Sequence, residues 1–147
     1  MSETAEWGNV CSRVDTCALT GAAAFFTGIK GAEVLVNGPL WCYFYALRHL
    51  EKSNSRLGER FHGSQPDNNA VVYGTEECLT DALDYIRENR APSILLIENS
   101  CSVSLIGDDI EGIAAKAKLP FSVMGMDSGG LSGGFAEGYS KASIRLW

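Results

Sequence analysis

Three of the five cysteines in the chain stand beside apolar runs that predict buried strands. Cys42 comes five residues after Asn37, and Cys101 comes four residues after Ile97, close to where two of these runs end. In an open parallel sheet, ligands bind outside the carboxyl ends of the strands, so we expect both thiols at that edge. Cys17 precedes the first run, in a segment of small residues that could fold back over the same edge. Thiols gathered in this way indicate metal ligands.

Simple burial is the alternative for each thiol, because free cysteine is among the residue types most often found in protein cores. Cys42 has a further property, since a position near a helix N-terminus stabilises the thiolate, the form that binds metal. Cys78 lies on a predicted helix beside Leu79 and Ala82 and is interpreted as packing, while Cys11 receives no assignment. No CxxC pair occurs, so neither a zinc ribbon nor a thioredoxin site is predicted.

The glycine-rich stretch 130–134 matches the G-x-S-x-G pattern of a hydrolase nucleophile elbow. The histidine of such a triad must follow in the chain, but no histidine follows His62, and the lysine of a phosphate-binding loop is also missing. We therefore interpret the stretch as a flexible turn that could pack close to a cofactor or partner. His49 and His62 have no ligand at suitable spacing, so surface roles are expected. Asp108 and Asp109 are more simply helix caps than catalytic carboxylates.

Four short apolar runs bounded by turn-forming residues predict strands that are buried on both faces of a sheet. Segments with a helical spacing of apolar residues lie between them. Strands and helices that alternate in this way form βαβ units, so the predicted fold class is α/β. We expect a three-layer, Rossmann-like domain with a parallel sheet of about four strands and helices on both faces. The predicted strands lie within residues 31–38, 68–74, 91–99 and 119–127, and the predicted helices within 39–52, 75–90, 107–120 and 134–146.

Local signals place the helix boundaries and one long loop. A proline takes the first position of the helix predicted over 39–52. Thr75 is the predicted N-cap of the next helix, and the polar stretch 53–69 is predicted to be a surface loop. The apolar stripe expected to anchor the helix of residues 39–52 to the sheet is Leu40, Phe44, Leu47 and Leu50.

Length, charge and hydropathy limit the function classes. At 147 residues the chain fits one domain, divided here into an arm over residues 1–16 and a folded domain over residues 17–147. The net charge is −6 and no long basic run occurs, so no nucleic-acid partner is expected. The apolar windows are shorter than a membrane span, and the acidic N-terminus does not resemble a signal peptide. We therefore expect a cytoplasmic protein with free thiols and no membrane partner.

Two stretches resemble motifs of the nitrogenase component 1 superfamily. That group includes the molybdenum-iron protein subunits, the scaffolds that assemble their cofactor, and tetrapyrrole reductases such as dark-operative protochlorophyllide reductase. The stretch CALTGAAAFFTGIKGAEVLVNGPLWCYFYA (17–46) is similar to the family's segment of Cys and Gly followed by a hGPxGC turn. The stretch SCSVSLIGDDIEGIAAKA (100–117) is similar to its Cys-to-IGDDI motif. Weaker similarity continues to about residue 147.

This resemblance implies a cofactor and two kinds of partner. Cys17, Cys42 and Cys101 would be ligands of an iron-sulfur cluster, of the 4Fe-4S type or a larger bridged type, at the seam between two related subunits. A 4Fe-4S cube needs four protein ligands and one chain supplies three, so a second homologous subunit, identical or different, is expected to complete the set. An ATP-dependent iron-sulfur reductase is the implied electron donor.

The implied function is electron relay from that reductase to a substrate or metallocofactor in a nitrogenase-like oxidoreductase. Two alternatives stay open: a scaffold that assembles a metallocluster without turnover, and a plain α/β interaction domain whose cysteines are packed. Family members normally continue for two further domains that enclose the substrate, so the chain is interpreted as a fragment or a minimal relative, and no catalytic residue is assigned. Trp41 also stands in the turn where the family usually has a small residue.

Overall fold

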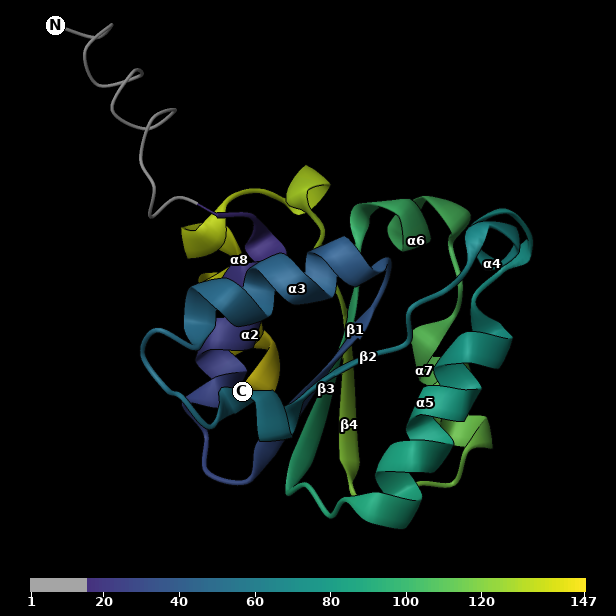
Figure 1. Ribbon diagram of the computed structural model, residues 1–147, viewed down its shortest axis with the longest axis horizontal. Coiled ribbons are helices and arrows are strands. Elements are labelled where there is room, and N and C mark those ends of the chain that lie inside the picture. Colours follow the sequence, from purple (N-terminus) through teal and green to yellow (C-terminus); the bar gives the residue numbers. More distant parts are fainter. Residues whose placement is uncertain (1–15) are drawn as a thin grey trace, which may run out of the picture.

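The computed structural model describes residues 16–147, and its centre is a sheet of four parallel strands (Figure 1). The order across the sheet is β2-β1-β3-β4, so β1 and β3 form the middle. The strands are β1 (Ala32–Asn37), β2 (Phe61–Gly63), β3 (Ile94–Asn99) and β4 (Ser122–Asp127). The α-helices are α2 (Ala18–Thr27), α3 (Leu40–Leu50), α4 (Asn68–Tyr73), α5 (Glu76–Asn89), α6 (Cys101–Ile106), α7 (Ile110–Lys116) and α8 (Phe135–Leu146).

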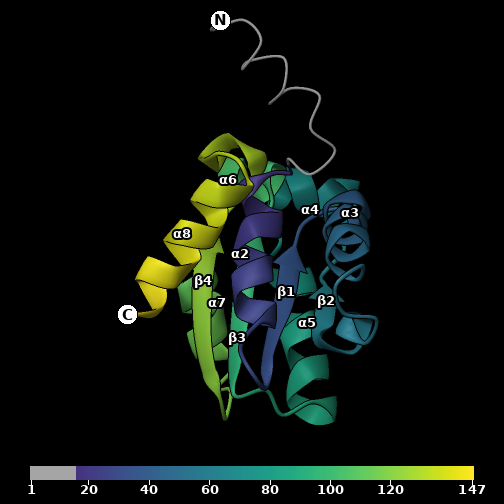
Figure 2. The same cartoon turned by 90° about the vertical axis from the view of Figure 1, so that its left-hand side faces the viewer.

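Helices cover both faces of the sheet, which confirms the predicted α/β, three-layer, Rossmann-like fold class. Helices α2, α3 and α8 lie on one face, and α5 and α7 lie on the other (Figures 1 and 2). Helix α6 lies at the carboxyl ends of the strands, with α4 close to it (Figure 1). Because all four strands are parallel, the turns that leave them meet at this one edge.

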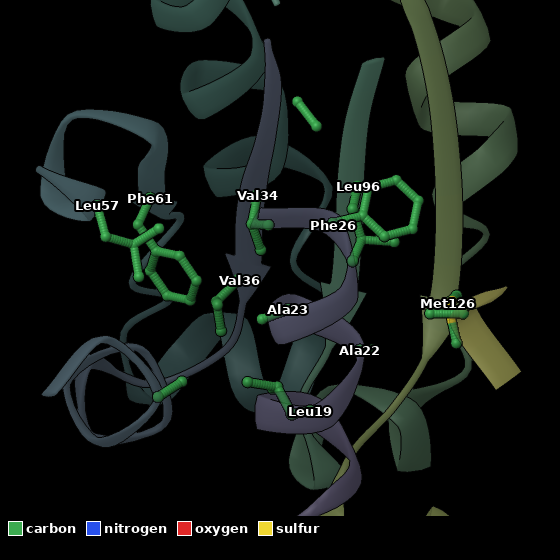
Figure 3. Close-up of a cluster of buried hydrophobic side chains, with 13 residues drawn as sticks. Leu19, Ala22, Ala23, Phe26, Val34, Val36, Leu57, Phe61, Leu96 and Met126 are labelled. Atoms are coloured by element: carbon green, nitrogen blue, oxygen red, sulfur yellow. The ribbon is translucent and has the colours of Figure 1, made fainter. Parts of the chain in front are cut away.

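Successive residues of β3 point to opposite helix layers. Leu96 belongs to the buried cluster that includes residues of α2 (Figure 3), whereas Leu95 and Ile97 belong to the cluster that includes residues of α5 and α7. All three leucine and isoleucine side chains are completely buried. A strand covered on both faces must be apolar at every position, which explains why β3 is a continuous apolar run in the sequence.

Helices α2 and α8 cross in close contact because each carries a glycine at the crossing. A Cβ atom on Gly21 would overlap the backbone of Phe135, and one on Gly138 would overlap the backbone of Ala18. The small-residue segment thus forms helix α2 along one face of the sheet, and this helix begins near the carboxyl edge (Figure 2). Its N-cap is Cys17. The helix predicted over residues 134–146 is confirmed as α8.

The strand predicted over residues 68–74 is wrong, because Asn68–Tyr73 form helix α4, which ends at its C-cap, Gly74. The Asp67 side chain caps this helix by accepting a hydrogen bond of 2.8 Å from the backbone N–H of Ala70. Val72 and Tyr73 are 69% and 87% exposed, so the apolar run does not enter the core. The sheet still has four strands, because β2 lies inside the stretch 53–69 that was predicted to be a surface loop. There the buried Phe61 pairs with Val34 of β1.

The helix predicted over residues 39–52 is confirmed as α3, but only part of its predicted stripe faces the sheet. Leu47 and Leu50 pack against the core, whereas Leu40 and Phe44 are exposed. The most deeply buried residue of the helix is Ala46, which has a side chain small enough for close packing. The predicted anchoring role of Leu40 and Phe44 is therefore wrong.

The caps of two helices differ in detail from the sequence prediction. Thr75 stands at the N-cap of α5 as predicted, but its hydroxyl makes no capping hydrogen bond and instead donates to Asp108 at 2.7 Å. Asp109 caps α7 by accepting a hydrogen bond of 3.0 Å from the backbone N–H of Gly112. The two neighbouring aspartates thus have different partners.

The predicted arm over residues 1–16 lies outside the described residues except for Thr16, and Cys11 lies outside them too. Within residues 16–147, no helix has the length and apolar character that crossing a membrane requires.

Candidate functional site

The turns that follow β1 and β3 touch each other at the carboxyl edge of the sheet. The backbone N–H of Ser100 donates a hydrogen bond of 3.0 Å to the carbonyl oxygen of Asn37. A Cβ atom on Gly38 would overlap the Ser100 side chain, so the glycine permits this close approach. Cys101 is the first residue of α6, and Cys42 is the third residue of α3. The two cysteines therefore stand in the first turns of helices that begin side by side.

Cys17 reaches the same edge through the glycine-rich stretch 129–134. It is the N-cap residue of α2 and pairs with Gly134 in an antiparallel bridge. The next residue, Ala18, donates its backbone N–H to the carbonyl oxygen of Gly133 at 3.0 Å. These contacts fix the start of α2 against a segment that follows β4. We call the region that carries Cys17, Cys42 and Cys101 the thiol edge.

Two glycines border the small space between Cys17 and Cys101. A Cβ atom on Gly130 would lie 3.6 Å from the Cys101 Sγ and 3.6 Å from the Cys17 Cβ, so the two cysteines flank this position. A Cβ atom on Gly129 would lie 2.5 Å from the Cys101 backbone nitrogen and 2.8 Å from its Sγ, which is too close for any side chain. The stretch interpreted as a flexible turn thus packs directly against the thiol edge.

The three thiols are close enough to affect one another's charge. Burial raises the pKa of the Cys42 thiol, and the negative charges of Cys17 and then Cys101 raise it further. Within residues 16–147, no three Cys, His, Asp or Glu side chains stand close enough together to hold a single metal ion. The described thiols therefore affect one another's charge without meeting at one single-ion site.

Polar side chains next to the thiol edge form a hydrogen-bonded chain across the strand ends. The side-chain amide of Asn37 donates to the Asn99 side-chain oxygen and to the Thr75 hydroxyl, each at 3.0 Å. The amide of Asn99 donates to Asp127 at 2.9 Å, and the hydroxyl of Ser104 donates to the same carboxylate oxygen at 3.0 Å. These hydrogen bonds tie β1, β3, β4 and α6 together, and so they fix α6, which carries Cys101, and the end of β1, which precedes the helix of Cys42.

Glu98 is a functional candidate that the sequence analysis did not single out. Its side chain is completely buried, three residues before Cys101 on β3. Burial raises the pKa of the Glu98 carboxyl well above its usual range, the negative charge of Cys17 raises it further, and the nearby Ser128 hydroxyl partly offsets the rise. The available sequence signal was a lone acid at the end of the apolar run ILLIEN.

The remaining cysteine and histidines of the described chain do not join the thiol edge. Cys78 lies in α5 and lines a groove that it shares with His62. The expectation that His62 has only a surface role is wrong, because its Nε2 lies 2.6 Å from the Glu33 carboxylate. Arg90 donates to the same carboxylate at 2.8 Å. His49 packs its ring near that of another aromatic residue, Phe135, with 6.1 Å between the ring centroids.

Comparison with known proteins gives a match over nearly the whole described chain. The family model described as Nitrogenase component 1 type Oxidoreductase matches residues 17–147. The nitrogenase iron-molybdenum cofactor biosynthesis protein NifE of Methanosarcina barkeri is 29% identical over 134 residues, which cover 88% of this chain. The nitrogenase molybdenum-iron protein alpha chain of Methanosarcina barkeri is 33% identical over 110 residues, which cover 69% of this chain.

A solved structure, Nitrogenase Cp1 at pH 5, has a similar fold, with a TM-score of 0.76 and 25% sequence identity over 89% of this chain. The chain spans only part of each of these proteins: 29% of the NifE protein, 20% of the alpha chain and 29% of the solved chain. The similarity therefore covers one region of much longer proteins.

Proposed function

We propose, since the chain belongs to the family of nitrogenase component 1 type oxidoreductases, that residues 17–147 form its N-terminal cluster-binding domain. Cys17, Cys42 and Cys101 would be ligands of an iron-sulfur cluster, 4Fe-4S or larger and bridged, within a nitrogenase-like oxidoreductase. Electrons would pass from an ATP-dependent iron-sulfur reductase to a substrate or metallocofactor. The observation that carries this proposal is the approach of three thiols, from three separate segments, at one edge of the sheet.

A bound iron-sulfur cluster would supply one-electron transfer at the thiol edge. The residues of this chain hold and shape that edge. The three thiolates would bind iron, while Gly129 and Gly130 keep the space beside Cys101 free of side chains. Hydrogen bonds among the polar residues at the strand ends fix the backbone, because a site held on rigid elements keeps its ligand geometry.

Iron binding at this edge would release protons. The raised pKa of Cys42 keeps its thiol protonated at neutral pH, and a thiol must lose its proton to become a ligand. Burial is the larger cause of that shift, and positive iron would offset both burial and the repulsion among the sulfurs, because it favours all three thiolates. The dipole of α3 adds to this effect at Cys42, which lies in the first turn of that helix.

A second homologous subunit, identical or different, would share the cluster. The described residues of one chain offer three thiols at the edge, and a 4Fe-4S cluster takes four protein ligands. Trp41 of α3 and Leu105 of α6 are 64% and 77% exposed on the helices that begin there. Burial of such large apolar side chains against a partner supports association at this end of the molecule. We expect this assembly in the cytoplasm, where thiols stay reduced, without nucleic-acid or membrane partners.

A second candidate function is a scaffold that holds a nascent metallocluster and passes it on. The similarity to a protein of iron-molybdenum cofactor biosynthesis favours this alternative. The two functions predict different behaviour of the loaded protein. A scaffold would transfer its iron to an acceptor protein that lacks its cluster, whereas a relay would keep its iron through repeated cycles of reduction and oxidation.

The test of cluster binding is anaerobic reconstitution of the purified chain with ferrous iron and sulfide. We expect a brown protein with several iron atoms per chain or per dimer and an electron paramagnetic resonance signal after reduction. Cys17→Ser, Cys42→Ser and Cys101→Ser should each lower the iron content. Cys78→Ser is the matched control, because Cys78 lies on α5 away from the thiol edge, and it should bind iron like the wild type. A colourless wild type, or three variants with unchanged iron, would leave only the plain interaction domain.

A further inference from the structure

A groove lies between the start of α2 and the second half of α3, two helices that cover the same face of the sheet (Figure 1). Its volume is about 540 Å³. The residues that line it are Thr16, Tyr45, Arg48, His49, Glu51 and Lys52, and we call it the α3 groove. Residues 1–15 precede Thr16 in the chain, so this arm is attached to a residue of the groove wall.

The α3 groove continues into a strip of aromatic side chains on the surface of α3. Tyr45 is 65% exposed and stacks on Trp41 with 5.9 Å between the ring centroids. Phe44, which is also exposed, packs edge-on against both rings. Exposed apolar side chains that touch one another form the kind of surface that marks an interaction site. The groove therefore favours an occupant that has an aromatic side chain of its own.

The groove wall is positively charged, although the chain as a whole has a net charge of −6. It carries two cationic side chains, Arg48 and Lys52, and one acidic side chain, Glu51, which pairs with Arg48. Two positive charges against one negative charge leave the wall with a net positive charge. An occupant with acidic side chains would therefore be complementary to it.

The arm has the side chains that such a groove would bind. Its sequence, MSETAEWGNVCSRVD, contains one tryptophan, Trp7, and three acidic residues against one basic residue. Trp7 stands nine residues before Thr16, and nine residues of extended chain span up to about 30 Å. Helix α3 has 11 residues and is about 16 Å long. The arm is therefore long enough to place Trp7 at any point along α3.

We propose that residues 1–15 of this chain dock in the α3 groove, with Trp7 against Tyr45 and acidic side chains of the arm beside Arg48 and Lys52. The second homologous subunit is the competing occupant. Attachment at Thr16 favours the arm, because a short tether gives a segment an effective concentration of about millimolar at its own groove. A docked arm covers the second half of α3 and leaves Trp41, in the first turn, to face the subunit. The inference does not require a bound cluster.

The test uses the natural Cys11 of the arm as a reporter in the full chain. Lys52→Cys introduces a thiol into the groove wall, and Glu51→Cys introduces one at a second position there. The five residues from Cys11 to Thr16 span up to about 17 Å. The matched control is Leu131→Cys, because Leu131 is 73% exposed and its neighbour Gly130 lies beside Cys17, within the same reach of the arm.

Each iron-free protein is oxidised with diamide at low protein concentration, and the disulfides that contain Cys11 are identified by peptide mass spectrometry. Circular dichroism checks that every variant is folded. We expect Cys11 to form a disulfide with the thiol at position 51 or 52 about tenfold faster than with the thiol at position 131, because docking holds the arm beside α3.

A second set of variants tests the contacts that hold the arm. Trp7→Ala should lower the rate of disulfide formation at position 52 about tenfold, because it removes an aromatic contact. Glu3→Lys combined with Glu6→Lys should lower this rate too, because the reversed charges repel the groove wall. Glu77→Lys combined with Glu88→Lys, at exposed sites on α5, is the matched control and should leave the rate unchanged.

Equal rates at positions 51, 52 and 131, or a faster rate at position 131, would overturn the inference. A disulfide that joins two chains, seen as a dimer on a non-reducing gel, would place the arm on a second copy and would overturn it too. So would a rate at position 52 that Trp7→Ala leaves unchanged. Because the proteins carry no iron in this test, a failure of cluster binding would leave its result unaffected, and the two proposals fail separately.

Discussion

The side-chain amide of Asn37 donates a hydrogen bond of 3.0 Å to the side-chain oxygen of Asn99, and both residues are buried where neighbouring strands end. Each asparagine has a further partner, since Asn37 also donates to Thr75 and Asn99 donates to Asp127. The strand ends that precede Cys42 and Cys101 are thus joined directly by side chains. Removing one partner of such a buried hydrogen bond lowers stability by more than the net contribution of the bond, because the other partner is left buried and unpaired.

We predict that Asn37→Ala and Asn99→Ala each lower the free energy of unfolding by about 1 to 3 kcal/mol, because each leaves buried groups unpaired. The double variant should lose less than the sum, because the second change removes a group that the first has already orphaned. Urea denaturation of the four proteins measures this coupling. Asn69→Ala, at an exposed position on α4, should change stability by at most about 0.5 kcal/mol. Strictly additive losses would contradict the prediction.

Alanine at Gly129 and at Gly130 should have different effects. Gly129→Ala places a methyl group against the backbone of Cys101, so we expect a loss of about 1 to 3 kcal/mol in urea denaturation. At Gly130 a methyl group meets only ordinary contacts and the backbone φ is not positive, so stability should be unchanged or higher by up to about 1 kcal/mol.

The same methyl group at Gly130 would occupy the space between Cys17 and Cys101. Gly130→Ala should therefore fold normally but take up less iron on reconstitution than the wild type. Iron analysis and thermal melting of the same sample separate the two effects. Wild-type iron content in a well-folded Gly130→Ala protein would show that the space between the two cysteines is not needed.

Removing Arg90, the partner of the buried Glu33 carboxylate, should lower the free energy of unfolding more than neutralising Glu33 itself. Its side chain is 6% exposed, whereas that of Arg90 is 33% exposed and can be hydrated. Arg90→Met leaves a buried charge with only His62 beside it and should cost about 3 kcal/mol. Glu33→Gln should cost less, about 1 to 2 kcal/mol. Arg56→Met removes an exposed ion pair and is the matched control, with at most about 0.5 kcal/mol expected. The free energies of unfolding are measured by urea denaturation at pH 7. A lower value for Glu33→Gln than for Arg90→Met would contradict this ranking.

The reactivity of Cys42 should depend on its neighbours. Its pKa is raised by burial and by the charges of Cys17 and Cys101, so little thiolate forms at pH 8. Cys17→Ser or Cys101→Ser removes one source of the repulsion that raises the Cys42 pKa, which should speed alkylation of Cys42 by iodoacetamide, measured by peptide mass spectrometry. Cys78→Ser should leave the rate unchanged. Equal alkylation rates of Cys42 in all four proteins would mean that Cys17 and Cys101 do not affect its pKa.

The raised pKa of Cys42 should make the stability of the apoprotein fall at alkaline pH. A thiol whose pKa is higher in the folded chain than in the unfolded chain holds its proton more tightly when folded. The stabilisation is present below the unfolded thiol pKa of about 8.5 and is lost as the pH rises through the folded value. The apoprotein should therefore lose more stability between pH 8 and pH 10 than the Cys42→Ser variant does.

Features that depend on local sequence were predictable. Runs such as ILLIEN are apolar at every position because both faces of the strand are covered, and this pattern needs no knowledge of the partners. Parallel strands then place the residues that follow them at one edge, which is why Cys42 and Cys101 could be assigned to a shared edge from spacing alone.

Features that depend on contacts between distant segments were not predictable in the same way. Strand β2 is only three residues long and is held in the sheet by its pairing with β1, whereas Val72 and Tyr73 of the apolar run 68–74 stay exposed. His62 finds its carboxylate on the neighbouring strand, 29 residues away in the chain. The burial of Glu98 was hard to predict, because it depends on the helices that pack over this face of the sheet and not on the residues next to Glu98 in the chain.

The contact between α2 and α8 has a consequence for the order of events during synthesis. Cys17 is the first of the three thiols to leave the ribosome, but the segments that fix its position, the glycine-rich stretch and α8, are the last of the described elements to emerge. Domains generally fold as units once their segments are available. The three thiols can therefore acquire their mutual geometry only after α8 has left the ribosome, so a metal group that needs all three could bind only after that point.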